Sequence, residues 1–232
     1  MRDWQGRRYW LTGATGTLGR ALASHLSRAG AHLVLSARDA GGLEEVARGL
    51  PGQSTLLPFD LADGEALARA VAGMELPDGF IHLGLPGLWR EFPREGRGRR
   101  GDAVGAGLLA AMHLADALLP AMVARGSGHL VLAASALGRR GRRGAGAVGA
   151  ASAGIIHLAE TLRAEAQGRG VAVQLLLPGR AAGASAEATA RALFEGMCGD
   201  TFRLGHPLPA DWAARIGQFL PDWLWLRLAG RA

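Results

Sequence analysis

The fold of this 232-residue chain is indicated most clearly by one segment, Tyr9-Trp10-Leu11-Thr12-Gly13-Ala14-Thr15-Gly16-Thr17-Leu18-Gly19-Arg20. An apolar run ends in a glycine-rich turn, and a helix pattern rich in alanine and leucine begins inside that turn. The three glycines let the backbone turn sharply and approach a diphosphate, whose charge would lie on the free N–H groups at the positive end of the helix. The stretch therefore predicts a strand, a phosphate-binding loop and the start of a helix.

Strand and helix patterns alternate along the rest of the chain. This alternation is typical of an α/β fold with a doubly wound parallel sheet of about seven strands and helices on both faces. We expect strands near 8–12, 32–36, 55–58, 79–84, 129–134, 171–177 and 201–204. We expect helices near 18–29, 40–48, 64–72, 102–124, 147–168 and 185–197. Residues 1–232 then form one domain, in which residues 206–232 are a C-terminal amphipathic helical tail.

Composition favours one domain with a buried core. Hydrophobic residues make up 49% of the chain, which is long enough for a substantial core. The single cysteine, Cys198, cannot form an intrachain disulfide, and Met1-Arg2-Asp3-Trp4 leads to the first strand without an apolar signal region. Both features predict a cytoplasmic protein. The formal charge of +6 reflects 26 arginines against 20 acidic residues, with no lysine, and it permits an anionic partner.

The chain resembles the short-chain dehydrogenase/reductase family in four motifs that follow one another at the family's spacing. They are Thr12-Gly13-x-x-Gly16-x-x-Gly19 at the first turn, Ser36-Ala37-Arg38 after the second strand, Asp60-Leu61 after the third and Pro178-Gly179 after the sixth. The resemblance covers nearly the whole chain. It implies a single-domain Rossmann-like fold that binds a nicotinamide dinucleotide.

The resemblance also implies which residues hold the cofactor. They are Thr12, Gly13, Thr15, Gly16, Thr17, Leu18, Gly19, Arg38, Asp60, Leu61, Pro178 and Gly179. The Asp60-Leu61 pair matches the family's adenine contact, but a helix cap at 64–72, made by Asp60 or Asp63, is an equal alternative.

Arg38 indicates the type of dinucleotide. NAD-selective members of the family carry an acidic residue at this place, whereas an arginine can clamp a 2′-phosphate with two hydrogen bonds. The resemblance therefore implies NADP(H) rather than NAD(H), with a vestigial site and a merely solvated Arg38 as the alternatives. The neighbouring Asp39 is expected to cap the helix at 40–48.

The reactive half of the site departs from the family pattern. Ser135 stands at the position of the family's serine. Val148 and Ser152 stand at the positions of its tyrosine and lysine, and Gly107 stands at that of the asparagine that organises a proton-relay water. Hydride transfer to a carbonyl leaves charge on oxygen, so an acid must supply a proton. Val148 has none to give, the only tyrosine is Tyr9 in the first strand, and the chain contains no lysine.

Two further segments differ from the family. Its Asn-Asn-Ala-Gly motif is replaced by His82-Leu83-Gly84-Leu85, and we expect His82 to be a buried or edge histidine. After Pro178-Gly179, Gly183 stands where the family has a threonine, and Ser185 opens a helix almost at once. Little chain is therefore left for a substrate lid.

Arginines gather after the fourth and fifth strands, within 90–100 and at Arg139, Arg140, Arg142 and Arg143. The carboxyl ends of strands are the ligand side of a doubly wound sheet. The two clusters could attract an anion such as a CoA thioester or an acyl carrier protein, or they could be solvated loops. Nucleic acid is disfavoured because aromatic residues make up only 6% of the chain.

Small residues in helices 102–124 and 147–168 allow close helix approach, and these helices pair across the dimer interface of the family. A homodimer, or a heteromer with a related chain, is expected. His113 and His157 lie on these helices as interface or core residues, and we expect no metal site.

The tail carries an apolar stripe at helical spacing, interrupted by Pro221. It consists of Trp212, Ile216, Phe219, Trp223 and Leu226. Such a stripe packs on its own domain or on a partner. The alternative, which the sequence does not favour, is peripheral docking on a membrane surface.

Three functions follow from the sequence. The first is a catalytically silent family member that keeps the fold and NADP(H) binding and serves as a structural or regulatory partner. The second is an NADP(H)-dependent carbonyl or alcohol oxidoreductase that uses Ser135 and an unorthodox proton donor. The third is a module that recruits an acidic partner through its arginine loops.

Overall fold

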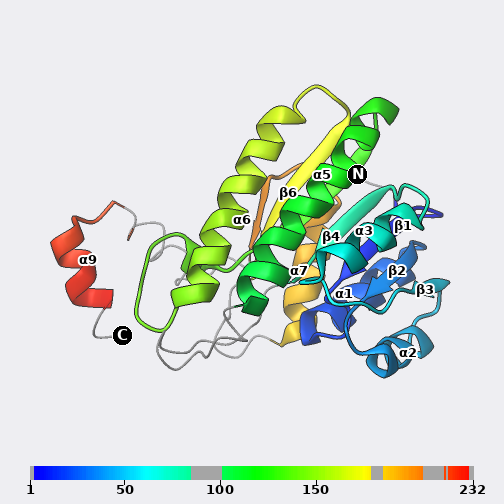
Figure 1. The fold of residues 1–232 in the computed structure, drawn as a ribbon, viewed down its shortest axis with the longest axis horizontal. Helices are drawn as coiled ribbons and strands as arrows, with labels where there is room; N and C mark the ends of the chain where they lie inside the picture. The colour runs from blue at the N-terminus through cyan, green and yellow to red at the C-terminus, as the bar shows by residue number, and fades with distance from the viewer. Residues whose placement is uncertain (1–2, 85–100, 179–184, 206–216, 218, 230–232) are drawn as a thin grey trace.

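Seven parallel strands form the centre of the molecule, which is described by a computed structural model over residues 3–84, 101–178, 185–205, 217 and 219–229 (Figure 1). The sheet order is β3-β2-β1-β4-β5-β6-β7. The strands are β1 (Arg8–Thr12), β2 (His32–Ser36), β3 (Ser54–Leu56), β4 (Gly79–His82), β5 (Gly128–Ala133), β6 (Val171–Leu177) and β7 (Arg203–Gly205). The chain runs outward from β1 to β3 and then returns to β4 on the other side of β1. In such sheets this reversal point marks the ligand crevice.

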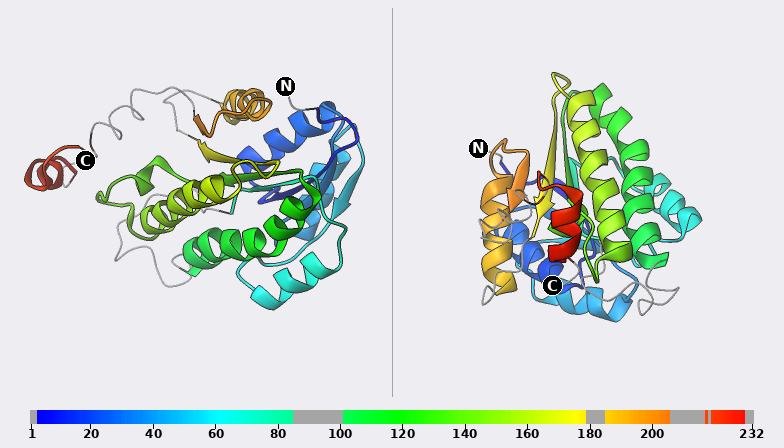
Figure 2. Two further views of the ribbon diagram at one scale, coloured as in Figure 1. Left: turned by 90° about the horizontal axis from the view of Figure 1, so that it is seen from above. Right: turned by 90° about the vertical axis from the view of Figure 1, so that its left-hand side faces the viewer.

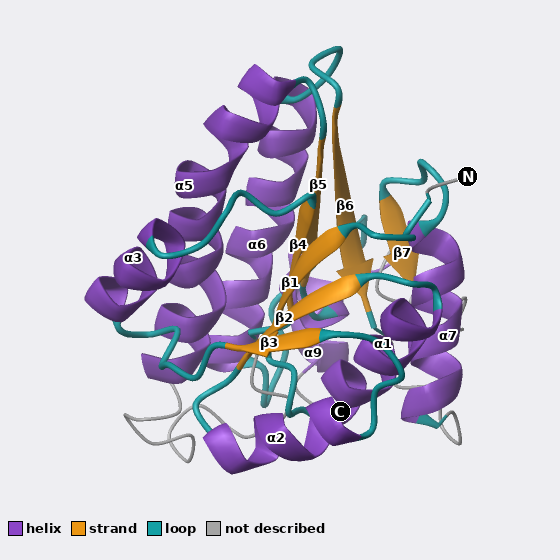
Figure 3. Cartoon of the chain, turned by 90° about the vertical axis from the view of Figure 1, so that its right-hand side faces the viewer, coloured by secondary structure: helices purple, strands orange, loops and turns teal. Residues whose placement is uncertain are grey.

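Helices cover both faces of the sheet, which gives three layers (Figure 3). On one face lie α1 (Thr17–Arg28), α2 (Ala40–Arg48) and α7 (Ala186–Met197). On the other lie α3 (Gly64–Ala72), the π-helix η2 (Ala103–Leu109), α5 (Ala110–Arg125) and α6 (Gly146–Glu165). The short 3₁₀-helix η3 (Ala136–Gly138) and the tail helix α9 (Asp222–Ala229) complete the described elements.

The alternation of side chains along β1 divides the core in two. Tyr9 and Leu11 point into the cluster with α1 and α7, whereas Trp10 points into the cluster with α3, α5 and α6. All three are buried because helices cover both faces of the strand, as parallel sheets require. The predicted fold class is confirmed, and β1, β2 and β6 have the bounds that the sequence predicted.

The helix predicted over 102–124 differs from the structure in kind. Its first part, Ala103–Leu109, is a π-helix, and the regular helix begins only at Ala110. Two glycines, Gly105 and Gly107, lie in the π-helical part, where the absence of side chains weakens the preference for regular α-helical geometry. π-helical turns occur frequently at functional sites.

Among the described helices, the segment Ala103–Arg125 is long and apolar enough to cross a membrane by length and composition. Within this segment, Leu114, Leu118 and Met122 are buried in the core cluster that includes side chains of β4 and β5. About two fifths of this apolar window is buried in the domain (39%), while Val104, Leu109 and Met112 are exposed.

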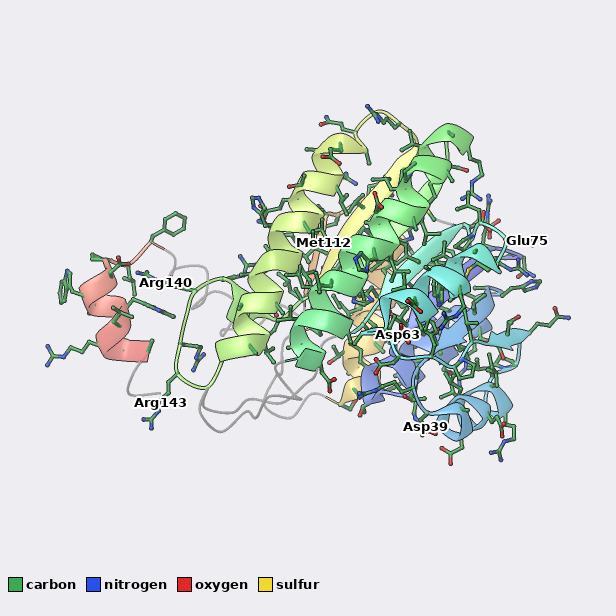
Figure 4. The ribbon with its side chains drawn as sticks, viewed as in Figure 1. Asp39, Asp63, Glu75, Met112, Arg140 and Arg143 are labelled. Atoms are coloured by element: carbon green, nitrogen blue, oxygen red, sulfur yellow. The ribbon has the colours of Figure 1, made fainter. Side chains whose placement is uncertain are left out.

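The tail helix α9 stands apart from the layered body, beside the loop that follows η3 (Figures 1 and 2). Arg140 of this loop donates a hydrogen bond to the Leu220 carbonyl at 2.6 Å and pairs with Asp222 at 2.6 Å (Figure 4). Its guanidinium lies 5.1 Å from the ring centre of Trp225, whose indole N–H donates to the Gly141 carbonyl at 2.6 Å. One arginine of the second cluster is therefore used to attach the tail.

The described residues of the predicted tail stripe do not pack on the described part of the domain. Phe219 is 88% exposed, Trp223 69% and Leu226 67%, so the first alternative, packing on their own domain, is wrong for these three, and packing on a partner stays a prediction. The physical reason is that Arg140 and Trp225 make the attachment, which leaves the opposite side of α9 uncovered. Trp212 and Ile216, the other two residues of the stripe, lie outside the described residues.

A buried polar chain closes the amino end of the sheet, opposite the ligand crevice. The Tyr9 hydroxyl lies 3.0 Å from His129 Nδ1, and His129 Nε2 lies 2.8 Å from Gln174 Oε1. The Gln174 amide nitrogen in turn donates to the carbonyls of Gly199 and Thr201, both at 3.0 Å. The only tyrosine of the chain thus serves to join β1, β5, β6 and the segment before β7.

We expect Tyr9→Phe to destabilise the fold by about 1–3 kcal/mol, because it removes a buried hydrogen-bond donor to His129. Urea unfolding followed by circular dichroism measures this loss. Nucleotide affinity should not change, since Tyr9 lies at the other end of the sheet. A variant as stable as the parent protein would show that the polar chain contributes nothing.

Candidate functional site

The glycine-rich loop connects β1 to α1 at the carboxyl edge of the sheet. Gly13 adopts a left-handed backbone conformation (φ +71°), and a Cβ there would lie 2.9 Å from the Leu83 carbonyl oxygen. A Cβ on Gly19 would overlap the Gly13 carbonyl oxygen. Both positions therefore require glycine, and the loop lies directly against the end of β4.

The amino end of α1 offers backbone N–H groups to an anion. Gly16 is the N-cap and supplies no side chain to the first turn, which contains no acidic residue. The Arg20 side chain holds the loop by donating from Nε to the Thr15 carbonyl at 3.0 Å, and it pairs with Glu45 of α2 at 3.1 Å. A positive helix end without a side-chain cap is suited to an anion, and the diphosphate contact expected at Gly16 and Thr17 stays a prediction.

Thr12 and His82 form a buried bridge beneath this loop. They are partners in the β1–β4 register, and Thr12 Oγ1 lies 2.9 Å from His82 Nδ1. His82 Nε2 lies 2.9 Å from the carbonyl oxygen of Gly107 in η2. A carbonyl only accepts, so Nε2 carries the hydrogen and Nδ1 accepts from the Thr12 hydroxyl. Thr12, predicted to contact the cofactor, is fully buried here and makes this bridge.

Burial lowers the pKa of His82 to about 4, because the interior disfavours the charged ring. The hydrogen bonds to the backbone carbonyls of Gly107 and Ala106 oppose this effect without cancelling it. His82 is thus a neutral structural histidine, and the prediction of a buried histidine is confirmed. The sequence did not reveal the bridge, because only the register of β1 and β4 brings Thr12 beside His82.

The turn before α3 shows which aspartate caps the helix. Asp63 is the N-cap of α3, and its carboxylate accepts from the N–H groups of Glu65 and Ala66 at 3.0 and 3.1 Å (Figure 4). Asp60 instead accepts from the Ala62 N–H at 2.9 Å, and Leu61 is buried in the core. The helix-cap alternative is therefore taken by Asp63, and the adenine contact of Asp60 and Leu61 stays a prediction.

Arg38 follows β2 with its side chain 65% exposed and lies 3.5 Å from the carboxylate of Asp102. Asp102 is the residue before η2, so this pair joins the second strand to the π-helix. Asp39 is the N-cap residue of α2, as predicted, although its side chain makes no capping hydrogen bond. Pro178 directly follows β6, while Gly179 and Gly183 lie outside the described residues.

Ser135 and Ser152 lie together at the carboxyl end of β5. The Ser135 N–H donates to Ser152 Oγ at 3.1 Å, and Ser135 Oγ accepts from the Leu137 N–H at 3.2 Å as the cap of η3. Ser152 is fully buried. Ser152, at the position of the family's lysine, thus accepts a hydrogen bond from the backbone of Ser135, at the position of the family's serine.

Val148, at the predicted tyrosine position, lies in an apolar cluster. It is buried with Ala103, Ala147 and Ala151, and Leu108 packs against the group. This cluster joins α6 to η2. It contains no group that could donate or accept a proton.

Tyr9 lies far from Ser135. Its hydroxyl is bonded to His129, which precedes Ser135 by six residues along β5 and the turn after it, a path of about 20 Å at strand spacing. The sequence contains no other tyrosine and no lysine, so this chain places neither a phenol nor an ammonium side chain beside Ser135.

The remaining predicted sites are only partly described. The first arginine cluster, with Arg90, Arg94, Arg97, Arg99 and Arg100, lies outside the described residues. In the second cluster Arg140 attaches the tail, and the Arg143 backbone N–H donates to the Ala229 carbonyl at 3.4 Å. Within the part of the chain that the structure describes, no group of three or more His, Cys, Asp or Glu side chains could hold a metal ion.

The seven-stranded order and the glycine loop define a doubly wound nucleotide-binding fold. A short chain dehydrogenase model matches residues 102–192, and a model of the NAD dependent epimerase/dehydratase family matches residues 9–135. The chain belongs to the short-chain dehydrogenase/reductase family, which is a family of oxidoreductases.

Curated relatives include several reductases. The chain is 29% identical to ketoacyl reductase HetN of Nostoc sp. over 77% of its own length and 65% of the relative's. It is 27% identical to the 3-oxoacyl-[acyl-carrier-protein] reductase FabG of Haemophilus influenzae, covering 75% of this chain and 74% of that one. Mouse dehydrogenase/reductase SDR family member 7B is 30% identical over 73% of this chain but only 56% of its own length.

Solved structures share the fold. A short-chain dehydrogenase from Streptomyces avermitilis superposes with a TM-score of 0.83 at 20% identity, over 92% of both chains. A short-chain dehydrogenase from Sphingobium yanoikuyae in complex with NADPH has a TM-score of 0.80 at 22% identity, over 91% of this chain and 92% of that one.

The bridge at His82 predicts a pH-dependent stability. An unfolded histidine takes up a proton near pH 6.5 and the folded one only near pH 4, so the unfolded state binds more protons between these values. The stabilisation is complete above pH 6.5 and is lost as the pH falls toward 4, by up to about 3 kcal/mol. Urea unfolding at a series of pH values measures it.

His82→Asn should remove this part of the pH dependence. His32→Asn is the matched control, because His32 is exposed at the start of β2 and should leave the profile unchanged. If the His82→Asn profile runs parallel to that of the parent protein, the bridge does not depend on a neutral His82.

Proposed function

We propose that this chain is a non-catalytic member of the short-chain dehydrogenase/reductase family that binds NADP(H) and acts as a structural or regulatory partner of another chain. One observation carries the proposal. Ser152, at the position where the family resemblance expects a lysine, is fully buried and accepts a hydrogen bond from the Ser135 backbone. The interior at this point is built around a small neutral side chain.

The cofactor half of the site supports nucleotide binding. Gly13 and Gly19 leave room for a close backbone approach, and the first turn of α1 can receive the diphosphate. Arg38 is exposed after β2, where it can reach a 2′-phosphate. The relatives in complex with NADPH and NADP have the same fold, which is consistent with NADP(H) here. When bound, the nicotinamide of this cofactor supplies a hydride.

The reactive half argues against turnover. A hydride acceptor needs a proton donor, and losing a general acid typically costs about 10²–10⁴-fold in rate. Val148 lies in an apolar cluster, and the Ser135 hydroxyl already caps η3. A serine hydroxyl without an adjacent base or cation is too weak an acid to replace the tyrosine.

The proposed partner is a second copy or a related family member, and the proposed location is the cytoplasm. The helices η2, α5 and α6 offer small residues for close packing, and Val104, Leu109 and Met112 are between 40% and 46% exposed on this side. Cys198 supports a reducing compartment, since it cannot pair within the chain, and its sulfur accepts a hydrogen bond from the Trp4 indole.

A second function is favoured by the names of the relatives. HetN and FabG are a ketoacyl reductase and a 3-oxoacyl-[acyl-carrier-protein] reductase, so this chain could be an NADP(H)-dependent carbonyl reductase that uses Ser135 and an unorthodox donor. An arginine-loop module for a CoA or acyl-carrier partner gains less support, because Arg140 is committed to the tail.

Turnover separates the two functions. With NADPH and a panel of ketones and 3-oxoacyl thioesters, we expect binding without oxidation of the nucleotide above background. Oxidation that disappears in Ser135→Ala would overturn the non-catalytic proposal in favour of the reductase.

Ser152→Ala should lower the free energy of unfolding by about 1 kcal/mol, through loss of the Ser135 hydrogen bond, and leave the NADPH dissociation constant unchanged.

Arg38 and Asp102 should set the choice of nucleotide. Arg38→Ala should weaken NADPH binding by about tenfold or more and NADH binding little, because it removes a charged contact to the 2′-phosphate. Asp102→Asn should strengthen NADPH binding by about two- to fivefold, since it removes an exposed ion pair that competes for Arg38. Asp116→Asn on α5 is the charge-matched control. Equal effects of either variant on NADPH and NADH would contradict NADP(H) selectivity.

A further inference from the structure

The exposed large hydrophobic side chains of the described residues gather in two places. Val104, Leu109 and Met112 lie on η2 and α5 and are less than half exposed. The other four belong to the tail and are more exposed, from 49% to 88%. They are Phe219, Trp223, Leu226 and Leu228. Among the described residues, the most strongly exposed apolar surface is therefore the tail and not the helices expected to pair with another chain.

Trp223 and Leu226 form an outward face of the tail, because they are three residues apart on α9 and share a helix side. Phe219 precedes the helix, and Leu228 lies three residues after Trp225, on the Trp225 side of α9. Trp225 lies on the inner side, where its indole bonds to Gly141 beneath the Arg140 guanidinium. The helix stands at one end of the molecule, beyond the layered body (Figures 1 and 2), so nothing in the described structure covers this face.

The charges around α9 favour a negatively charged surface. Asp222 is the only acidic residue between positions 217 and 232, and Arg140 pairs with it at 2.6 Å. Arg227 is exposed in the last turn of α9, and Arg143 is exposed on the loop to which the helix is attached (Figure 4). The chain as a whole carries a net charge of +6. The tail therefore presents tryptophan, phenylalanine and leucine within a positively charged surrounding.

We propose that α9 and Phe219 dock on the surface of an anionic phospholipid bilayer, with Trp223 and Leu226 among the lipid headgroups and upper acyl chains. Indole rings favour the boundary between apolar and aqueous phases, and arginines next to an apolar helix face attract anionic lipids. A protruding helix face suits a fluid surface, because it needs no matching groove. Arg140 orients the helix and neutralises the Asp222 carboxylate, which anionic lipid would repel. This docking is independent of cofactor binding and of turnover.

Flotation of the full-length protein with vesicles tests the proposal. With phosphatidylcholine vesicles that contain phosphatidylglycerol, we expect the protein to float with the lipid. Pure phosphatidylcholine vesicles should bind it more weakly, and added salt should release it. The double variant Trp223→Ser/Leu226→Ser should lose about tenfold or more in vesicle affinity, because two apolar anchors are removed from an exposed face. Arg227→Glu should reduce binding to the phosphatidylglycerol vesicles only.

The matched control is Leu109→Ser, which removes an exposed leucine from the other apolar patch and should bind vesicles as the parent protein does. Circular dichroism of every variant confirms that the fold is intact. The proposal is overturned if the parent protein does not float, or if the double variant floats equally well. It is also overturned if the double variant changes the mass of the protein in solution instead of its lipid binding, since the face would then join two copies of the chain.

Discussion

The bridge from Thr12 through His82 to Gly107 holds together the elements that surround the ligand crevice. It joins β1, β4 and η2 at one buried point, directly beneath the loop where Gly13 touches the end of β4. Buried polar groups are stable only when their hydrogen bonds are satisfied, so the neutral ring with one donor and one acceptor nitrogen fits this place. The position of the glycine loop, the π-helix and the apolar cluster around Val148 all depend on it.

Short-range hydrophobic patterns in the sequence predicted the fold well. The site was predicted less well, because it depends on contacts between residues that are distant in the sequence. Alternating burial in β1 and helical spacing in α1 to α3 follow from short-range periodicity, which a sequence displays directly. The π-helix could not be predicted from the sequence. Its two glycines weaken the preference for an α-helix, but they do not specify which hydrogen-bond pattern replaces it. The partner of His82 lies 25 residues away at Gly107, and no local pattern reports such a contact.

The tail illustrates the same limit. Its apolar stripe was visible in the sequence, but the side that faces the domain is chosen by Arg140 and Trp225, whose contacts span about eighty residues. The arginine cluster, which the sequence offered as an anion site, turned out to contain the residue that fixes this choice. Long-range charged and aromatic contacts thus decided which apolar residues remained exposed.

Ser135 and Ser152 lie at the positions where the resemblance places the family's serine and lysine, and they contact each other directly. A lysine at position 152 would place an ammonium group at a fully buried point, where an unpaired charge is costly, and the neighbours of Val148 are small apolar residues that offer it no partner. Ser152 instead satisfies a backbone N–H of the Ser135 turn. In the proposed non-catalytic protein, the interior around position 152 is therefore suited to a small neutral side chain.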